Sequence, residues 1–578
     1  MNVRCKSIKD PVYGYVEVPV DIVRSIINTP VFQRLRRIAQ TSYEPLYPSA
    51  THNRFVHSLG VYFLGRIVTS CIRNESFGRM FRDDDIAARN RYDRYLTVFE
   101  TACLLHDVGH APFSHTGEGF FKDADGTTKN LHSRVAELLG NTAFEKLAAQ
   151  KKTAAPHELM SVIVGLKEFG EIEGLFKTEA EKDFFARAVT GYVYTRESGV
   201  EDDLSENGDH VNYSFLNCLI SLLNSSIVDV DRLDYLIRDA SCTGFESVLV
   251  DYRRLLNGVR IENLPSNGYK VVYSKQSVSV LENVVFAHDS ERKWIQGHPA
   301  IGYEMQLIKD AITEVQRKYP GVFGEASLGS DGTMLVSGLR VRYLCDDDIV
   351  FLMKNSDGDA CRRFLDRGDR YAPLWKSEAE FFALFGGWAP DRRQTLIEFY
   401  KTFNKSIFAL TPHRISEETL NLQEGDKNKA AEKVKVESDR ILRQRQERRV
   451  EALETYLSFI RLFKDFAAEN GLQFDFEILD GTPFSSNFGK DELRDILIDL
   501  PCKDGPVKLG DLTKLLSNDV SAANKFPQKI FYVFCKRPEN FNLACVRNLV
   551  DRLERFTDDN YAKIESVLVL NSSFYLRD

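Results

Sequence analysis

The sequence predicts a mainly α-helical fold, with a helical core over residues 1–320 and a smaller α+β domain over residues 456–578. Two observations support this division. Apolar residues recur at helical spacing in long runs of the first half, as in RFVHSLGVYFLGRIV from Arg54 onward. Near the C-terminus the pattern becomes strand-like alternation, in LQFDFEIL, KIFYVFCK and SVLVLNSS, with an amphipathic helix near 540–556.

Two further regions connect these parts. Residues 321–412 are expected to form a mixed insertion and a helical extension of the core, with Gly and Asp turns followed by aromatic-rich helix. Residues 413–455 are almost entirely polar and charged, which predicts an exposed helix or connector. A nucleic-acid-binding arm over 425–450 is the alternative interpretation of this segment.

The composition excludes several classes of protein. Of 578 residues, 43% are hydrophobic and 28% are charged, which is ordinary for a globular protein. A net charge of −8 argues against a general nucleic-acid coat protein but leaves room for a local basic channel. The ten cysteines form no CxxC pair, so we expect reduced thiols and a cytoplasmic location. We expect no secretory signal, no transmembrane helix and no membrane partner.

The elements of the predicted core follow from local patterns. The chain is expected to begin with a turn and strand at 7–18, two helices over 19–40 and a loop at 41–53. A helix from Arg54, an apolar helix entering 104–118 and further helices over 130–190 are expected to follow. After these we expect an apolar helix from Phe215 to Ile227 leading into VDVDRLDYLIRDA, and then a strand pair, YKVVYS with SVSVLE, before a long helical run.

The stretch LLHDVGHAPFSHTGE, residues 104–118, carries three histidines, an aspartate and a glutamate behind an apolar run. A metal ion is the simplest group that would repay the burial of so many polar side chains. Because His106 and His110 are four residues apart, we expect them to share a helix face. His115 and Glu118 would be in mutual reach if the helix restarts after Pro112.

Two other segments supply the remaining candidate ligands. His57 lies on the apolar helix from Arg54, where a satisfied core histidine is the plainer interpretation. Asp231 lies in VDVDRLDYLIRDA, for which a solvated acidic face is the plainer interpretation. Together, two imidazoles and two carboxylates would hold a divalent cation and leave positions open for water and substrate. This mixed set suits Mg, Mn, Fe or Zn.

The order H…HD…D resembles the signature of the HD phosphohydrolase superfamily. RLRRIAQ, HNRFVHSLGV, LLHDVGHAPFSH and DVDRLDYLIRD, within about residues 7–310, further resemble its deoxynucleoside triphosphate triphosphohydrolases, both dGTPase-like enzymes and the sterile-alpha-motif-and-HD-domain type. The resemblance implies an HD core over 1–320 and hydrolysis of dNTPs to deoxynucleoside and inorganic triphosphate. It also implies nucleotide effectors and a homo-oligomer, either a dimer, a tetramer or a hexamer.

The resemblance also implies roles for individual residues. It assigns the metal to His57, His106, Asp107 and Asp231. It assigns proton transfer to His115, oriented by Glu118, and contact with the phosphates to His110 and His157. It assigns the triphosphate clamp to Arg54 and Arg232, sugar or phosphate contacts to Tyr235 and Asp239, and recognition of the 3′-hydroxyl to Gln40.

The regulatory nucleotide site departs from the family pattern. Arg36 is retained, whereas Lys9 and Asn28 differ from the residues that the family uses to bind guanine. Two other classes of function remain open. One is an HD-type phosphodiesterase or nuclease acting on nucleic acid or on a nucleotide second messenger. The other is a non-catalytic nucleotide-sensing or scaffold protein.

Overall fold

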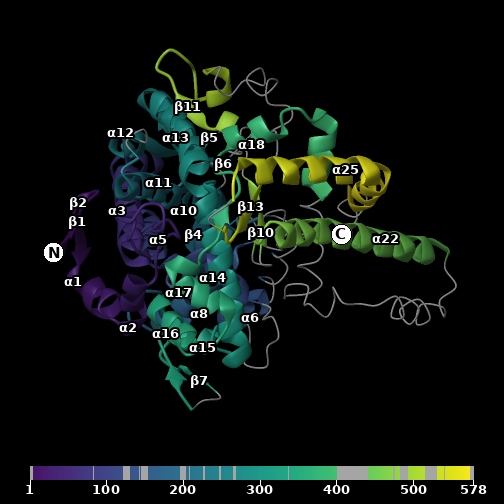
Figure 1. The fold of residues 1–578 in the computed structure, drawn as a ribbon. Helices are drawn as coiled ribbons and strands as arrows, with labels where there is room; N and C mark the ends of the chain where they lie inside the picture. The colour runs from purple at the N-terminus through teal and green to yellow at the C-terminus, as the bar shows by residue number, and fades with distance from the viewer. Residues whose placement is uncertain are drawn as a thin grey trace. The chain divides into compact units, whose positions relative to one another are not determined.

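The computed structural model describes residues 4–82, 84–121, 131–141, 154–195, 203–206, 209–225, 228–245, 249–264, 268–335, 338–399, 440–472, 476–481, 493–513, 530–538 and 541–572, together with Phe144 and Leu147. The chain forms two compact units (Figure 1). Unit 1 comprises residues 1–296, 304–367 and 484–525, and unit 2 comprises residues 297–303, 368–483 and 526–578. The candidate site lies within unit 1.

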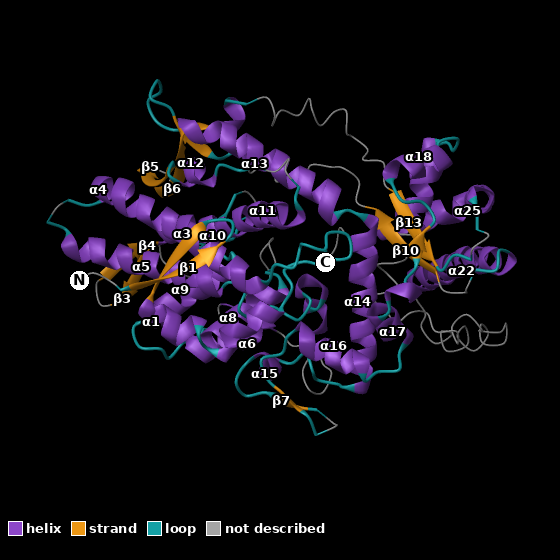
Figure 2. Cartoon of the chain, turned by 60° about the vertical axis from the view of Figure 1, so that its left-hand side comes forward, coloured by secondary structure: helices purple, strands orange, loops and turns teal. Residues whose placement is uncertain are grey.

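Unit 1 is built mainly from helices (Figure 2). Its helices are α1 (Val20–Ile22), α2 (Pro30–Gln33), α3 (Arg54–Cys71), α4 (Phe77–Met80), α5 (Ile86–Leu105), α6 (Leu131–Leu139), α8 (Pro156–Phe169), α9 (Glu179–Thr190), α10 (Tyr213–Leu223), α11 (Val230–Thr243), α12 (Tyr252–Leu256), α13 (Val278–Glu291), α14 (Pro299–Lys318, in unit 1 from Glu304), α15 (Glu325–Leu328), α16 (Asp346–Lys354) and α17 (Asp359–Leu365). Short 3-10 turns include Arg34–Arg37, Ser114–Thr116, Glu118–Phe120 and Lys275–Ser277, and π turns cover Val23–Ile27, Ile72–Ser76 and Arg292–Gln296.

Helix α3 is the centre of this unit. The side chain of Asn53 caps it by accepting a hydrogen bond from the amide of Val56. Helices α5 and α11 pack against it, and its apolar side chains, such as Phe55 and Leu64, are buried. Burial of each such side chain contributes roughly 1.5–3 kcal/mol. The residues that face α5 and α11 are therefore held in a rigid part of the core.

By length and hydropathy alone, one helical run among the described residues, Arg54–Met80, could cross a membrane. Its most apolar window is 67% buried within the protein. This degree of burial is what the central helix of a folded core shows.

The strands of unit 1 form small sheets. β1 (Cys5–Asp10) and β2 (Gly14–Pro19) form an antiparallel hairpin, as do β3 (Asp203–Glu206) with β4 (Asp209–Asn212) and β7 (Thr333–Met334) with β8 (Arg340–Val341). A further sheet has the order β12-β11-β6-β5. It contains β5 (Val259–Leu264), β6 (Gly268–Ser274), β11 (Leu497–Asp499) and β12 (Val507–Lys508). Because β11 pairs in parallel with β6, residues 484–525 belong to unit 1 although they lie near the C-terminus.

Unit 2 is a small α+β assembly. Its antiparallel sheet has the order β10-β13-β9, formed by β10 (Phe476–Gly481), β13 (Ile530–Cys535) and β9 (Ala372–Pro373). Its helices include α18 (Glu378–Phe385), α22 (Arg440–Glu469) and α25 (Leu543–Ser572). The fully buried Trp375 donates its indole N–H to the carbonyl of Phe531 at 2.7 Å and contacts the rings of Phe381 and Phe385. An aromatic core therefore joins helix and sheet within this unit.

The expected fold class, mainly α with smaller α+β parts, is confirmed. Two expected strands are wrong. SVSVLE lies in the turn Lys275–Ser277 and helix α13, and the partner of β6 is β5. SVLVLNSS lies largely within helix α25. Of the expected charged connector, residues 413–439 lie outside the described part, and 440–455 lie in α22.

Candidate metal centre and adjacent histidine pocket

Four predicted ligands converge at the contact between α3, the end of α5 and the start of α11. The Nε2 atom of His57 lies 3.5 Å from Oδ2 of Asp107 and 3.0 Å from Oδ1 of Asp231. The Nε2 atom of His106 lies 3.6 Å from each of these oxygens and 3.3 Å from Nε2 of His57. Such separations suit donor atoms around an ion with bonds of about 2.0–2.2 Å.

The tautomers of both imidazoles are fixed for metal binding. Nδ1–H of His57 donates to the carboxylate of Asp234 at 2.7 Å, and Nδ1–H of His106 donates to the carbonyl of Cys103 at 2.9 Å. Each ring therefore directs the lone pair of Nε2 toward the centre. The side chain of Asp231 is 41% exposed, which leaves one side of the centre open. The residues present thus fit a divalent cation.

Asp234, which the sequence analysis did not assign a role, orients His57. It accepts two hydrogen bonds from Arg238, at 2.9 and 3.0 Å, and Arg238 also binds Asp10 of the β1–β2 turn at 3.0 Å. A Cβ atom on Gly60 would lie 1.8 Å from Oδ1 of Asp234, so only glycine permits this approach of α11 to α3. The i, i+4 pairing of Asp234 with Arg238 on an apolar helix was the signal available in the sequence.

The electrostatic field of the centre favours positive charge. Burial alone would lower the pKa of His57, but the carboxylates of Asp231 and Asp234 outweigh it and raise that pKa to about 10. Burial would raise the pKa of Asp107, yet Arg54, His106 and His57 hold it well below its ordinary value. Ionised carboxylates therefore face a position where a cation would be stabilised.

Arg54 lies inside this network. Its guanidinium donates to Oδ2 of Asp107 at 2.6 Å, to Oγ of Ser114 at 2.9 Å and to the carbonyl of Gln40 at 3.3 Å. These contacts connect the metal centre to the two segments that flank it. A role in binding triphosphate remains a prediction for this residue.

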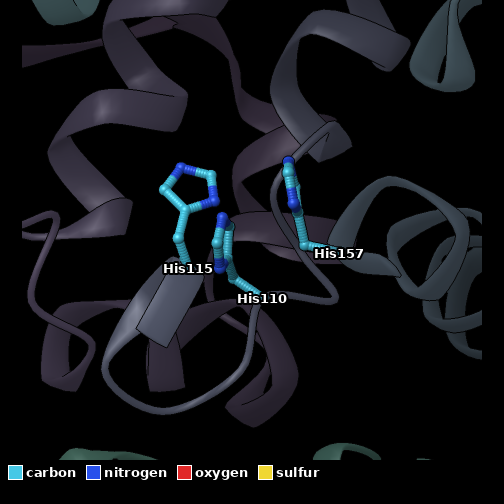
Figure 3. A group of neighbouring side chains, drawn as sticks. All are labelled: His110, His115 and His157. Carbon is cyan, nitrogen blue, oxygen red and sulfur yellow. The ribbon is translucent and has the colours of Figure 1, made fainter. Parts of the chain in front are cut away.

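Three histidines form a second cluster beside the metal centre (Figure 3). The rings of His110 and His157 are stacked, with centroids 4.4 Å apart, and His115 contacts both edge to face. Glu118 accepts from Nδ1–H of His157 at 2.6 Å and lies 3.3 Å from Nδ1 of His115. The expected pairing of His115 with Glu118 is thus present, and His157 shares the carboxylate.

The surroundings shift the pKa values of the three histidines in different directions. Burial lowers the pKa of His110 well below its ordinary value, and both of its ring nitrogens are buried without a hydrogen-bond partner among the described residues. Desolvation by the surrounding protein also lowers the pKa of His115, while the hydrogen bond to Glu118 raises it and the charge of Arg54 lowers it. Burial would lower the pKa of His157, but Glu118 raises it.

The geometry of the cluster does not suit a second metal ion. One nitrogen from each ring can be chosen so that all three lie within 4.8 Å of one another. However, the rings of His110 and His157 are inclined by only 16° and stacked. Two stacked rings cannot direct in-plane lone pairs at one ion. The ring nitrogens of the cluster can instead donate or accept hydrogen bonds.

Tyr235 and Asp239, two of the residues predicted to contact the sugar or phosphate, lie farther along α11. Asp239 accepts from Nε2–H of His52 at 2.7 Å, and this contact helps to raise the pKa of His52 to about 9, although burial opposes it. The side chain of Gln40 is buried, and its Oε1 has no hydrogen-bond partner in the described residues. Burial raises the pKa of Tyr235, so its hydroxyl stays protonated. Arg232 donates to the carbonyl of Ser225 at 3.4 Å.

The predicted regulatory residues lie elsewhere on unit 1. Lys9 of β1 is exposed, with Nζ 4.4 Å from the centre of the Tyr15 ring. Arg36 is exposed, with its guanidinium 3.6 Å from the centre of the Phe55 ring. Asn28 is exposed at the end of the turn Val23–Ile27. Their proposed part in nucleotide binding remains a prediction.

One local expectation is wrong. His106 and His110 do not share a helix face, because α5 ends at Leu105 and residues 106–109 form a turn. The helix does not restart after Pro112 either. Phe113 and Ser114 adopt left-handed φ values of 58° and 53°, and two 3-10 turns follow. This turn sends His106 to the metal centre and His110 to the histidine cluster.

Comparisons with known proteins agree with the resemblance seen in the motifs. The chain is 32% identical over 311 residues to the human deoxynucleoside triphosphate triphosphohydrolase SAMHD1, covering 53% of this chain and 44% of that protein. It is 33% identical over 257 residues to the chicken SAMHD1, covering 44% and 37%. An uncharacterized Bacillus subtilis protein, YwfO, is 31% identical, covering 44% of each chain. No family model matches the sequence.

The chain thus spans about half the length, or less, of the curated relatives it matches. Among solved structures, a hypothetical protein from Aquifex aeolicus aligns with a TM-score of 0.48 and 17% identity, covering 96% of this chain and 100% of that one. The resemblance to HD-domain dNTP triphosphohydrolases is confirmed by the curated relatives at about 30% identity.

Proposed function

We propose that this protein is a metal-dependent deoxynucleoside triphosphate triphosphohydrolase, which converts a dNTP to a deoxynucleoside and inorganic triphosphate. One observation carries the proposal. The four converging ligands, His57, His106, Asp107 and Asp231, lie beside a histidine that is paired with a carboxylate, His115 with Glu118. The similarity to SAMHD1 over about half of this chain names the substrate class.

A divalent ion held by these ligands would polarise the α-phosphate and stabilise its developing negative charge. The residues around it position the substrate. His110 and His157 would contact the phosphates, Gln40 would bind the 3′-hydroxyl, and Tyr235 and Asp239 would contact the sugar or phosphate. Because the aromatic ring of Tyr235 would lie against C2′, a ribonucleotide would bury an unpaired hydroxyl there, at a cost of about 1–3 kcal/mol.

In the reaction, a water oxygen would form a bond to the α-phosphorus and the bond to O5′ would break. His115 would accept the proton of the attacking water at Nε2, and the lowered pKa of its ring favours the neutral form that this role needs. Glu118 would fix the tautomer by accepting from Nδ1–H. The O5′ oxygen would leave as the hydroxyl of the deoxynucleoside with a proton from solvent water, and His115 would release to solvent the proton that it accepted.

Release of triphosphate tests the proposal. The purified protein is incubated with each dNTP alone and with all four together, in Mg²⁺ or Mn²⁺, and triphosphate is measured. We expect release from at least one dNTP, little release from ATP compared with dATP, and none from the variant Asp107→Ala. Activation by the mixed pool would support regulation by nucleotides, and the variants Arg36→Ala, Lys9→Ala and Asn28→Ala would test whether these residues take part.

The same assay separates the competing functions. Cleavage of a labelled oligonucleotide or a cyclic dinucleotide, with dNTPs left intact, would establish a phosphodiesterase or nuclease instead. If the effect of the protein in cells is unchanged in the variant Asp107→Ala, the protein acts as a non-catalytic nucleotide sensor or scaffold. The oligomeric state, as a dimer, tetramer or hexamer, is measured by light scattering with and without nucleotide.

A further inference from the structure

Asp346, the first residue of α16, lies far in sequence from every predicted site residue, yet it contacts both segments that flank the metal centre. Its Oδ1 accepts from the amide of Phe113 at 2.7 Å, and its Oδ2 accepts from the amide of Ala39 at 2.8 Å. Ala39 precedes Gln40, and Phe113 is two residues before His115. One carboxylate therefore joins the predicted sugar-reading segment to the predicted proton-transfer segment.

Arg34 makes a second set of contacts to the same turn. Its buried guanidinium donates to the carbonyls of Val108 at 2.7 Å and His110 at 2.9 Å, and to the carbonyl of Leu344 at 3.0 Å. Leu344 is two residues before Asp346. The guanidinium of Arg34 thus ties the segment that supplies Asp346 to the turn between His106 and His110, by binding backbone carbonyls of both.

Backbone strain marks the same place. In the described residues, three non-glycine residues have positive φ: Phe113 at 58°, Ser114 at 53° and Tyr343 at 53°. Phe113 and Ser114 lie in the turn that Asp346 contacts, and Tyr343 lies three residues before Asp346. Left-handed conformations of such residues cost about 1–3 kcal/mol each and persist only where surrounding contacts hold them. The amide of Phe113 is held by Asp346, and Ser114 donates to the carbonyl of Ala39 and accepts from Arg54.

We propose that Asp346 is a positioning residue of the active site, which holds the strained Phe113–Ser114 turn against Ala39 and thereby places His115 and Gln40 relative to the metal centre. It contacts neither the metal ligands nor the predicted substrate site directly. Its loss would leave the four ligands in place and misalign the two segments. A misplacement of about 1 Å can reduce turnover by about 100-fold.

The variant Asp346→Asn tests this proposal, because it keeps the shape of the side chain and replaces one acceptor oxygen by a donor. Asp347→Asn is the matched control, since Asp347 is 69% exposed and pairs with the equally exposed Arg37. For both variants, metal content, melting midpoint, kcat and KM for triphosphate release, and amide hydrogen exchange are measured. The activity readout rests on the proposed function, whereas the exchange readout does not.

For Asp346→Asn we expect wild-type metal content, a kcat reduced by about 10- to 100-fold with KM changed much less, and faster exchange of the Phe113 or Ala39 amide. Asp347→Asn should match the wild type in every measurement. An Asp346→Asn protein with unchanged kcat and unchanged exchange would overturn the proposal. So would one that loses metal or folding together with activity, because the residue would then act on the fold as a whole.

If the wild-type protein releases no triphosphate from any dNTP, the proposed function fails, and amide exchange alone decides the positioning role. Faster exchange at Phe113 or Ala39 in Asp346→Asn, with wild-type exchange in Asp347→Asn, would support the role in that case. Unchanged exchange at both amides would overturn it.

Discussion

At the scale of single residues, the geometry of the candidate metal centre depends on groups other than its four proposed ligands. Asp234 orients His57 and is itself held by Arg238, while the carbonyl of Cys103 orients His106. Outer partners of this kind usually change metal affinity by 10- to 100-fold when they are altered. The four predicted ligands are therefore only some of the residues that determine the geometry of this centre.

We expect Asp234→Asn to weaken metal binding by about 10- to 100-fold, because a neutral amide would replace the carboxylate that accepts hydrogen bonds from both His57 and Arg238. Competition with a chelator of known affinity measures the change. Asp21→Asn, at an exposed position of α1, is the control and should bind metal like the wild type. Equal affinity of Asp234→Asn and wild type would show that the His57–Asp234 contact does not orient the ligand.

The second prediction at this scale concerns pH. If neutral His115 accepts the proton, kcat/KM rises with pH through the pKa of His115 and then levels, and the midpoint lies below the ordinary value of about 6.5. Glu118 raises this pKa, so Glu118→Gln should move the midpoint to still lower pH and also reduce kcat, because a weaker base remains. The pH profiles of both proteins measure this. A midpoint that moves to higher pH would contradict the assignment.

At the scale of elements, the turn after α5 places His106 at the candidate metal centre and His110 in the histidine cluster. The amide of Gly109 donates to Oγ of Ser161 on α8 at 2.9 Å, and a Cβ atom there would lie 2.3 Å from the backbone of Met160 and Ser161. This contact holds the turn directly against α8, whose first turn carries His157. The position of the histidine cluster relative to the candidate metal centre therefore depends on a backbone contact.

Gly109→Ala should force α8 away from the turn. We expect a loss of about 1–3 kcal/mol in the free energy of unfolding, as for other overpacked sites, together with reduced kcat. Denaturant unfolding and triphosphate release measure the two effects. Gly119→Ala is the matched control, because Gly119 is exposed and no atom lies within 4 Å of a Cβ placed there. Comparable effects of both substitutions would show that Gly109 has no special role.

Sequence patterns predicted the positions of helices better than the points where helices end and the structure of the segments between them. The His57 and Asp231 helices follow from periodicity, but the end of α5 carries no glycine or proline before Gly109 to mark it. SVSVLE alternates like a strand yet becomes helical, because its buried residues, Val280 and Leu281, face the core at helical spacing together with Val284. Tertiary burial outweighed local alternation there.

The three aspartates at 346–348 show the same limit. In the sequence they read as an acidic helix start, which the helix dipole favours. In the structure, Asp346 faces the turn of the active site, Asp347 pairs with Arg37 at the surface, and Asp348 accepts from the amide of Cys345. Asp346 and Asp347 are distinguished by contacts with residues hundreds of positions away, whereas the contact of Asp348 is local.

At the scale of the whole molecule, the C-terminal part of the chain does not form one separate domain. Residues 484–525, which we expected within a domain over 456–578, belong to unit 1, and the strands of unit 2 come from before and after them. In the sequence these residues carry only short apolar runs. Their pairing with β6 is a non-local contact, which local patterns do not encode.

This arrangement predicts that a C-terminal residue stabilises the unit that contains the metal centre. Ile498 of β11 is fully buried and lies beside Tyr273 of β6 and Val507 of β12. Ile498→Ala should therefore lower the free energy of unfolding of unit 1 by about 2–5 kcal/mol. It should also speed amide exchange in β6, and both effects should appear in the transition that releases the metal. Leu512→Ala, at a side chain that is 39% exposed, is the control. Were 456–578 an independent domain, Ile498→Ala would leave metal release and the exchange of β6 unchanged.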